Sequence, residues 1–275
     1  MRFPMIPIRS LRVVVLLACV LMLAPGCSDD EDDPTKVETV LIPAGSFVMG
    51  DVVGDGVKEE LPTRTVTIDA FYMGKTEVTQ KLYRAIMGEN PSKYAGDNRP
   101  VEKVTWEKAI AFCNALSEKH GYEKCYAGSG STLTVDFTAN GFRLPTEAEW
   151  EYACRAGTTT SYHFGNTEAD LARHAWYAGT NDGQSSDVAR KQSNPHGLYD
   201  MHGNVFEWCW DWYDPNYYAV GDTDNPTGPD AGSERVCRGG SYFVIAFGCR
   251  SAFRSSSKPT IAGPDVGFRV VRRAS

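Results

Sequence analysis

The sequence lacks several features that would assign it to familiar functional classes. It has no excess of positive charge, because 28 Lys and Arg residues are outnumbered by 35 Asp and Glu residues, which gives a formal net charge of −7. This balance argues against nucleic acid as the partner. No Cys-x-x-Cys pair is present, so a zinc site is not expected. The histidines have no His-x-x-x-His spacing, and we expect them at the surface or capping turns: His120, His163, His174, His196 and His202.

The N-terminus has the pattern of an export signal. Arginines precede a short apolar run at residues 13–24, which is too short to span a membrane comfortably. The run ends in Ala-Pro-Gly-Cys27, which looks like a bacterial lipoprotein cleavage site. We therefore predict a signal peptide at residues 1–26 and lipidation of Cys27. The alternative is an ordinary signal peptide with an incidental cysteine.

An acidic block follows directly, from Ser28 to Asp33. Like charges repel one another and stay solvated, so residues 27–37 are predicted to form a flexible tether. The block also resembles the acidic signal that sends lipoproteins of Bacteroidota to the outer face of the outer membrane. We expect an outer-membrane lipoprotein on the cell surface, bound to the membrane through its lipid.

The rest of the chain, residues 38–273, predicts one domain, because it contains no second hydrophobic segment, no repeat and no long linker. Alternation predicts strands, and threonine N-caps before amphipathic stretches predict helices. The later part is rich in loop residues. We expect strands at 37–49, 64–72, 204–210, 235–242 and 266–271, and helices at 79–87, 105–119 and 146–154.

Six cysteines remain after the signal peptide: Cys113, Cys125, Cys154, Cys209, Cys237 and Cys249. An even number in an exported protein favours disulfides. Fifteen pairings of six cysteines exist, and the sequence alone does not choose among them.

Four phrases in the second half occur together and in a set order: residues 141–153 (GFRLPTEAEWEYA), 197–208 (GLYDMHGNVFEW), 238–242 (RGGSY) and 267–270 (GFRV). With IPAGSFVMG ending at Gly50 and KTEVT ending at Thr79, they resemble the formylglycine-generating enzyme, or sulfatase-modifying factor, family. The resemblance covers roughly residues 38–273. It implies a loop-rich α+β domain with a C-type-lectin-like fold.

The resemblance also locates the family's chemistry. Family enzymes hold copper(I) between two cysteines on the loop after Arg-Gly-Gly-Ser-Tyr, and soft thiolates suit that ion. Here the second cysteine matches Cys249, but the first falls on Val244. Ser241 matches a pocket serine of the family. We therefore expect no copper site. An oxygen-dependent oxidase remains an alternative if Cys154 or Cys237 supplies the second thiol.

The family also binds a structural calcium ion with the Gly-Asn-x-x-Glu-Trp segment. The resemblance carries its ligands onto the side chains of Asp200 and Glu207 and the carbonyl groups of Gly203 and Val205. Hard oxygen donors of this kind suit Ca²⁺. The alternative is that Asp200 caps a turn and Glu207 pairs with an arginine. The resemblance also favours the disulfides Cys209–Cys237 and Cys154–Cys249.

The segment 243–265 differs from the polar sequence of many family members. Exposed apolar residues usually mark an interaction site. The expected ligand surface consists of Tyr242, Phe243, Val244, Ile245, Phe247, Phe253, Ser255, Ser256, Ser257, Thr260, Ile261 and Asp265. The layout resembles the variable region of proteins diversified by diversity-generating retroelements, whose randomised asparagine codons yield these residue types.

We therefore predict a non-catalytic binding protein whose ligand is a protein or a glycan. The alternatives are a fixed loop with buried phenylalanines and a structural subunit of an outer-membrane complex. The tryptophans of the segment 206–213 fall on one strand face, and we expect Trp208, Trp210 and Trp212 in the core, although a carbohydrate platform has a similar composition.

Overall fold

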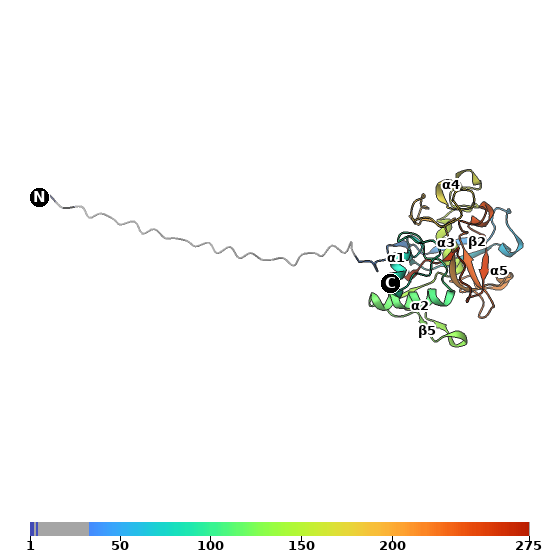
Figure 1. Cartoon of the computed structure of the whole chain (residues 1–275), viewed down its shortest axis with the longest axis horizontal. Helices are drawn as coiled ribbons and strands as arrows, with labels where there is room; N and C mark the ends of the chain where they lie inside the picture. Colours follow the sequence, from blue (N-terminus) through green and yellow to red (C-terminus); the bar gives the residue numbers. More distant parts are fainter. Residues whose placement is uncertain (3, 5–32, 275) are drawn as a thin grey trace. The chain divides into compact units, whose positions relative to one another are not determined.

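The computed structural model describes residues 1, 2, 4 and 33–274 and divides the chain into Met1–Asp33 and Pro34–Ser275 (Figure 1). Most of the predicted signal peptide, Cys27 and most of the tether lie outside the described residues. Among the described residues, no helix combines the length and the apolar character needed to cross a membrane. The account below concerns the second unit.

Two four-stranded sheets form the framework of this unit. The first has the order β1 (Thr39–Ile42), β4 (Phe71–Gly74), β12 (Val271–Arg273) and β7 (Phe142–Arg143), and its strand pairs are antiparallel. The second has the order β10 (Ser255–Ser257), β9 (Arg235–Arg238), β8 (Phe206–Trp212) and β11 (Val266–Gly267). The C-terminal strand β12 therefore lies inside a sheet, between strands from the first half of the domain.

Two small hairpins complete the strands: β2 (Gly45–Met49) with β3 (Arg64–Ile68), and β5 (Tyr126–Ala127) with β6 (Thr134–Val135). The predicted strand 37–49 is divided into β1 and β2 around Pro43, which has no N–H to donate to a ladder. The predicted strand 64–72 is likewise divided into β3 and β4. The hairpin β5–β6 had not been predicted.

The three predicted helices are present as α1 (Gln80–Met87), α2 (Trp106–Lys119) and α3 (Glu147–Arg155). Their N-caps are the expected threonines, and each hydroxyl accepts a backbone N–H from the first turn. Thr146 and Glu149 form a capping box, in which each side chain accepts the backbone N–H of the other residue. Two short helices, α4 (Leu171–His174) and α5 (Tyr217–Val220), lie in the loop-rich half.

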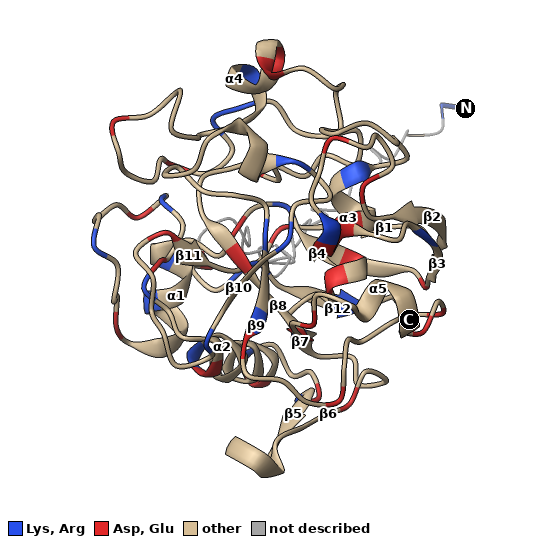
Figure 2. Ribbon diagram, turned by 90° about the vertical axis from the view of Figure 1, so that its right-hand side faces the viewer, with Lys and Arg blue, Asp and Glu red and all other residues tan. Residues whose placement is uncertain are grey.

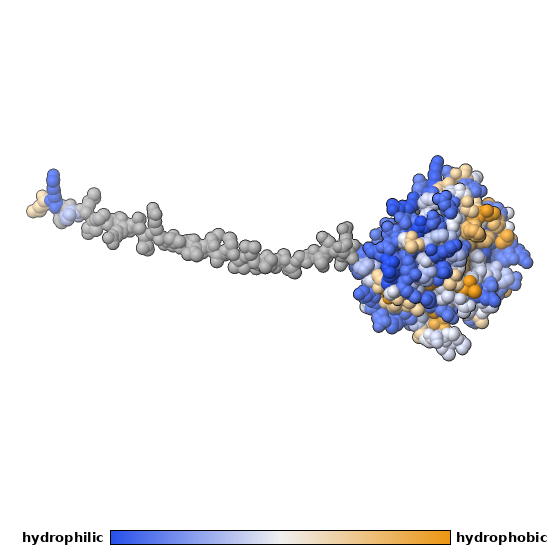
Figure 3. All heavy atoms as spheres, viewed as in Figure 1, coloured by the Kyte–Doolittle hydropathy of each residue, from blue (hydrophilic) through white to orange (hydrophobic). Residues whose placement is uncertain are grey.

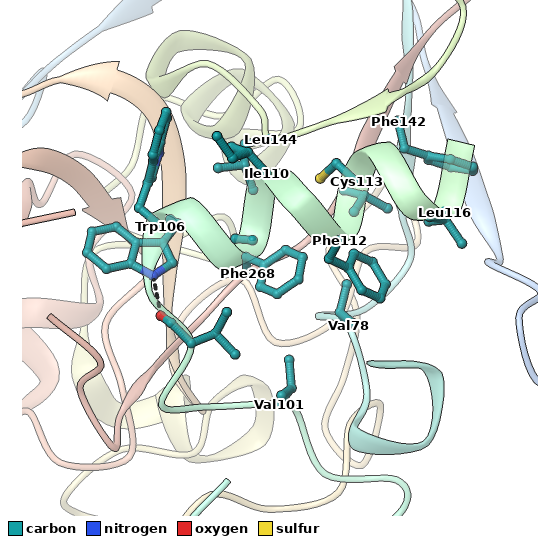
Figure 4. Packing of buried hydrophobic residues seen from close by; sticks show 14 of the residues in the cluster. Val78, Val101, Trp106, Ile110, Phe112, Cys113, Leu116, Phe142, Leu144 and Phe268 are labelled. Atoms are coloured by element: carbon teal, nitrogen blue, oxygen red, sulfur yellow. Dashed lines mark hydrogen bonds between the residues drawn. The ribbon is translucent and has the colours of Figure 1, made fainter. Parts of the chain in front are cut away.

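Helix α2 presents the predicted apolar face to the main core (Figure 4). Trp106, Ile110, Cys113 and Leu116 recur at helical spacing on one face and are all buried. Phe112 is buried as well and stacks on Tyr83, with ring centroids 5.4 Å apart. The helix therefore buries a wider face than these four residues alone.

Buried arginines join the sheets, helix α3 and the C-terminal segment. Arg254 contacts Glu147 on α3 with Nε and Nη2 at 2.7 and 2.8 Å, and Arg238 pairs with Glu151 one turn later. Figure 2 shows acidic and basic residues along the ribbon at α3. Because breaking one side of such a pair leaves an uncompensated charge, these contacts fix the register between distant segments.

The cysteines do not form the predicted disulfides. All six of them in the described part of the chain are buried free thiols. Cys237 pairs in register with Trp208, so Cys209 projects to the opposite face of β8, into another core cluster. Cys154 and Cys249 are also unbonded, and Cys154 Sγ lies 3.6 Å from the Ser251 hydroxyl. Both predicted pairings are therefore wrong for this structure.

Candidate functional site

The segment that follows β9 is held at both ends by buried contacts. The Ser241 hydroxyl donates to Asp265 over 3.0 Å, and the Tyr242 hydroxyl donates to the Pro264 carbonyl over 3.2 Å. At the other end, a ring nitrogen of His202 lies 2.8 Å from the Cys249 carbonyl oxygen. These contacts give residues 242–249 a defined path although they contain only one 3-10 turn, Ala246–Cys249.

Apolar side chains project from this fixed path into solvent. Phe243 is 73% exposed and Ile245 is 70% exposed, whereas the intervening Val244 is half-buried. Ile261 and Phe247 are also exposed. Figure 3 shows strongly apolar residues, in orange, on the surface of the folded unit. We call Phe243, Ile245, Phe247 and Ile261 the apolar loop surface.

The remaining predicted ligand residues are less accessible. Tyr242 is buried, and its ring meets that of Tyr94 edge to face with centroids 5.9 Å apart. Thr260 is exposed. The other members are half-buried: Val244, Phe253, Ser255, Ser256, Ser257 and Asp265. The structure therefore places Tyr242 beneath the surface as a support for its neighbours.

The position of the family's copper pair is apolar. Val244 packs against Gly248, where an added Cβ would meet the valine side chain at 3.0 Å. Cys249 is buried, and burial raises the pKa of its thiol, which disfavours the thiolate that a metal needs. Cys237 lies in a different core cluster from Cys249. Cys154 also belongs to a different core cluster from Cys249, and both are free thiols.

The four expected calcium positions lie beside a carboxylate that the sequence analysis missed. Glu77 is buried, and it accepts the Val205 N–H at 3.4 Å. Burial, with the nearby Asp200 and Glu207, raises the pKa of Glu77, and burial raises the pKa of Asp200 to about 6. One oxygen of Asp200 is buried without a hydrogen-bond partner. A cation would offset the negative charge of these carboxyl groups when they are ionised.

Glu207, however, is already paired. Arg269 contacts its two oxygens at 2.6 Å each, as the alternative of an arginine partner predicted, and the Trp150 indole N–H donates to it as well. The described residues contain no group of three or more His, Cys, Asp or Glu side chains that could hold a metal. Because Glu207 is already paired, Asp200 is the side chain among the expected calcium ligands that keeps an unpartnered oxygen.

The histidines also differ from the prediction. His163 and His202 are buried, and their ring nitrogens lie 2.9 Å apart. Burial and the adjacent imidazole lower the pKa of His163 to about 2, and burial lowers the pKa of His202 to about 4. The pair is therefore neutral and structural at pH 7. Their spacing of 39 residues gave no local signal of the contact.

Known proteins resemble the whole domain. Residues 27–274 match the family described as "Sulfatase-modifying factor enzyme 1-like domain". "Chaperone protein LppX" of Paenibacillus barcinonensis is 32% identical, over 96% of this chain and 99% of the relative. The formylglycine-generating enzyme of Streptomyces coelicolor is also 32% identical, over 86% of this chain and 89% of the enzyme.

Solved structures show the same fold. "Treponema denticola variable protein 1" has a TM-score of 0.80 and 37% identity, covering 86% of this chain and 95% of that chain. PvdO from Pseudomonas aeruginosa has a TM-score of 0.72 and 27% identity, covering 88% of this chain and 99% of that chain. These likenesses confirm the α+β, C-type-lectin-like fold. The chain belongs to the sulfatase-modifying factor family, whose members include the formylglycine-generating enzymes.

Proposed function

We propose that this protein is a non-catalytic binding protein that contacts its ligand, a protein or a glycan, through the apolar loop surface. The observation that carries the proposal is the exposure of Phe243 and Ile245 on a backbone held by buried contacts. Burying an apolar side chain of this size contributes about 1.5–3 kcal/mol. A surface that is rigid before binding loses little conformational entropy when it binds.

The absence of the first family cysteine supports the same proposal, because Val244 cannot ligate copper. The similarity to the variable protein of Treponema denticola supports diversification of residues 243–265. Every exposed member of the apolar loop surface is a residue that a randomised asparagine codon can encode. Deep sequencing of the 3′ end of the gene across a population tests this part, because an invariant stretch would exclude diversification.

The binding test uses a display screen with the wild-type protein and two variants. Phe243→Ala combined with Ile245→Ala should abolish capture of partners that the wild type binds. Val220→Ala is the matched control, because Val220 is 78% exposed and lies on α5, outside the surface. Partners that bind the double variant as well as the wild type would overturn the proposal.

We also propose that Cys27 carries a lipid that anchors the protein in the outer membrane, with the domain on the cell surface. The similarity to LppX covers 96% of the chain, so it extends into the N-terminal segment. Metabolic labelling with an alkynyl fatty acid should mark the wild type and not Cys27→Ser. Protease treatment of intact cells then tests surface exposure, since a protected domain would place it on the inner side.

A structural calcium ion at Asp200, Gly203 and Val205 completes the proposal. It is supported by the buried oxygen of Asp200 that has no hydrogen-bond partner, which a cation would provide with one. Millimolar calcium should raise the melting temperature of the wild type but not that of Asp200→Asn. An unchanged melting temperature of the wild type would refute it.

A further inference from the structure

A pocket on the described domain is lined by none of the residues of the apolar loop surface. It has a volume of about 700 Å³, within the range of small-molecule sites. One wall is helix α2, with Trp106 and Ile110, which Figure 4 shows on the same helix. The opposite wall is the β5–β6 hairpin with Tyr126 and Leu133, which lies beside α2 in Figures 1 and 2. Most of these walls are apolar.

Arg235 on β9 lines this pocket and is only 3% exposed. Its guanidinium carbon lies 3.5 Å from the ring centroid of Trp212 and 3.8 Å from that of Trp106. Nη1 donates to the Trp210 carbonyl, whereas Nε is buried and has no hydrogen-bond partner within the described residues. Aromatic rings hold the group in place, but they do not saturate its donors.

Arg235 differs from the other buried arginines of the described domain in its lack of a carboxylate partner. Seven arginines of the described domain are buried, and six have a carboxylate within 4.0 Å. The six are Arg143, Arg155, Arg238, Arg250, Arg254 and Arg269. Arg235 forms no ion pair among the described residues, so its charge is the uncompensated member of the set. A buried charge of this kind calls for a partner.

Neighbouring carboxylates do not supply that partner. Asp211 forms no ion pair with Arg235 among the described residues, and burial raises the pKa of Asp211 to about 8, which favours its neutral form at pH 7. Glu107 lies on the exposed side of α2, where it lines the pocket without pairing with Arg235. Burial lowers the pKa of Arg235 to about 10, which still leaves it charged at pH 7.

We infer that this pocket binds a small organic carboxylate with an apolar body, whose carboxylate pairs with Arg235 and whose body packs against Trp106 and Trp212. Guanidinium groups match the planar geometry of carboxylates. The apolar walls exclude a small inorganic anion as the best ligand, because such an ion would leave those walls empty. The site shares only Pro259 with the segment 243–265 and does not depend on the loop surface.

The test measures dissociation constants by calorimetry for 4-phenylbutyrate and for its uncharged amide, 4-phenylbutyramide. In the wild-type protein the carboxylate should bind about tenfold more tightly than the amide, as expected for one charge-assisted contact. Arg235→Gln should weaken the carboxylate to the level of the amide and leave the amide unchanged. A purely structural role for Arg235 would weaken both probes alike.

Two further variants keep the test decisive. Ala111→Phe, at an exposed position on α2 that lines the pocket, should fill the hollow and block both probes even if Arg235→Gln fails to fold. Val220→Ala, at an exposed position that does not line the pocket, should bind both probes as the wild type does. Equal affinities of the two probes for the wild type, no binding of either, or unchanged binding to Ala111→Phe would overturn the inference.

Discussion

Asp211 makes the stability of the domain depend on pH in a direction opposite to that of an ordinary paired carboxylate. It is buried on β8, and its carboxylate accepts the Glu147 N–H over 2.8 Å. Burial, and then the negative charge of Glu147, raise its pKa from 3.8 to about 8. Between these values the folded state holds a proton that the unfolded state has released. Stability is therefore highest at low pH and falls as the pH rises through this range.

The expected change in the free energy of unfolding follows from the one proton that the folded state holds and the unfolded state has released. The free energy of unfolding changes by about 1.4 kcal/mol per pH unit, so Asp211 should cost the wild type about 3 kcal/mol more at pH 7 than at pH 5. Asp211→Asn retains an oxygen for the Glu147 N–H and does not titrate. The advantage of the variant over the wild type should therefore grow by about 3 kcal/mol over this interval.

Urea denaturation followed by tryptophan fluorescence measures this difference at both pH values. The other raised carboxyl groups, Glu77 and Asp200, titrate in both proteins and cancel in the comparison. A variant whose advantage is the same at pH 5 and pH 7 would show that Asp211 is ionised in the folded protein. Asp211 would then be able to neutralise Arg235 as well.

Two other substitutions probe the segment that carries the loop surface. Glu60→Gln removes the carboxylate that contacts Arg250 at 2.7 and 2.8 Å. Because it leaves a buried charge without a partner, it should lower the free energy of unfolding, measured in urea, by about 3–5 kcal/mol. Replacing both partners, with Glu60→Met and Arg250→Leu, should lower the free energy of unfolding by less. Equal losses in the two proteins would contradict this. Val244→Cys places a thiol at the family's first copper position and should increase copper(I) affinity in competition with bicinchoninate, whereas Val244→Ser should not. No gain over the serine control would show that burial of Cys249 prevents metal binding.

Local signals predicted the parts of the fold that local contacts determine. Thr79, Thr105 and Thr146 were recognisable as N-caps because a cap bonds within its own first turn. The family motifs are also short patterns with fixed spacing, and the resemblance that they carry predicted the α+β class. The exposure of Phe243 and Ile245 also followed from the family position of their loop.

Contacts between distant residues could not be predicted in this way. Cys209 and Cys237 were placed on neighbouring strands, but the pairing of Cys237 with Trp208 sends the two thiols to opposite faces. Glu77 joins Asp200 and Glu207 from more than a hundred residues away. In the sequence, Arg235 looks like an ordinary strand residue. Only the packing shows that, among the buried arginines of the described domain, it is the one that forms no ion pair with a carboxylate.

The position of β12 inside its sheet has a consequence for how the protein matures. Residues 271–273 pair with β4 on one side, and residues 271 and 272 pair with β7 on the other, so the first sheet cannot close before these residues have joined strands from the first half of the domain. Such long-range closure is slow compared with the formation of local structure. Before residues 271–273 have joined the sheet, β4 and β7 lack the strand that lies between them, so the first sheet is completed late in folding.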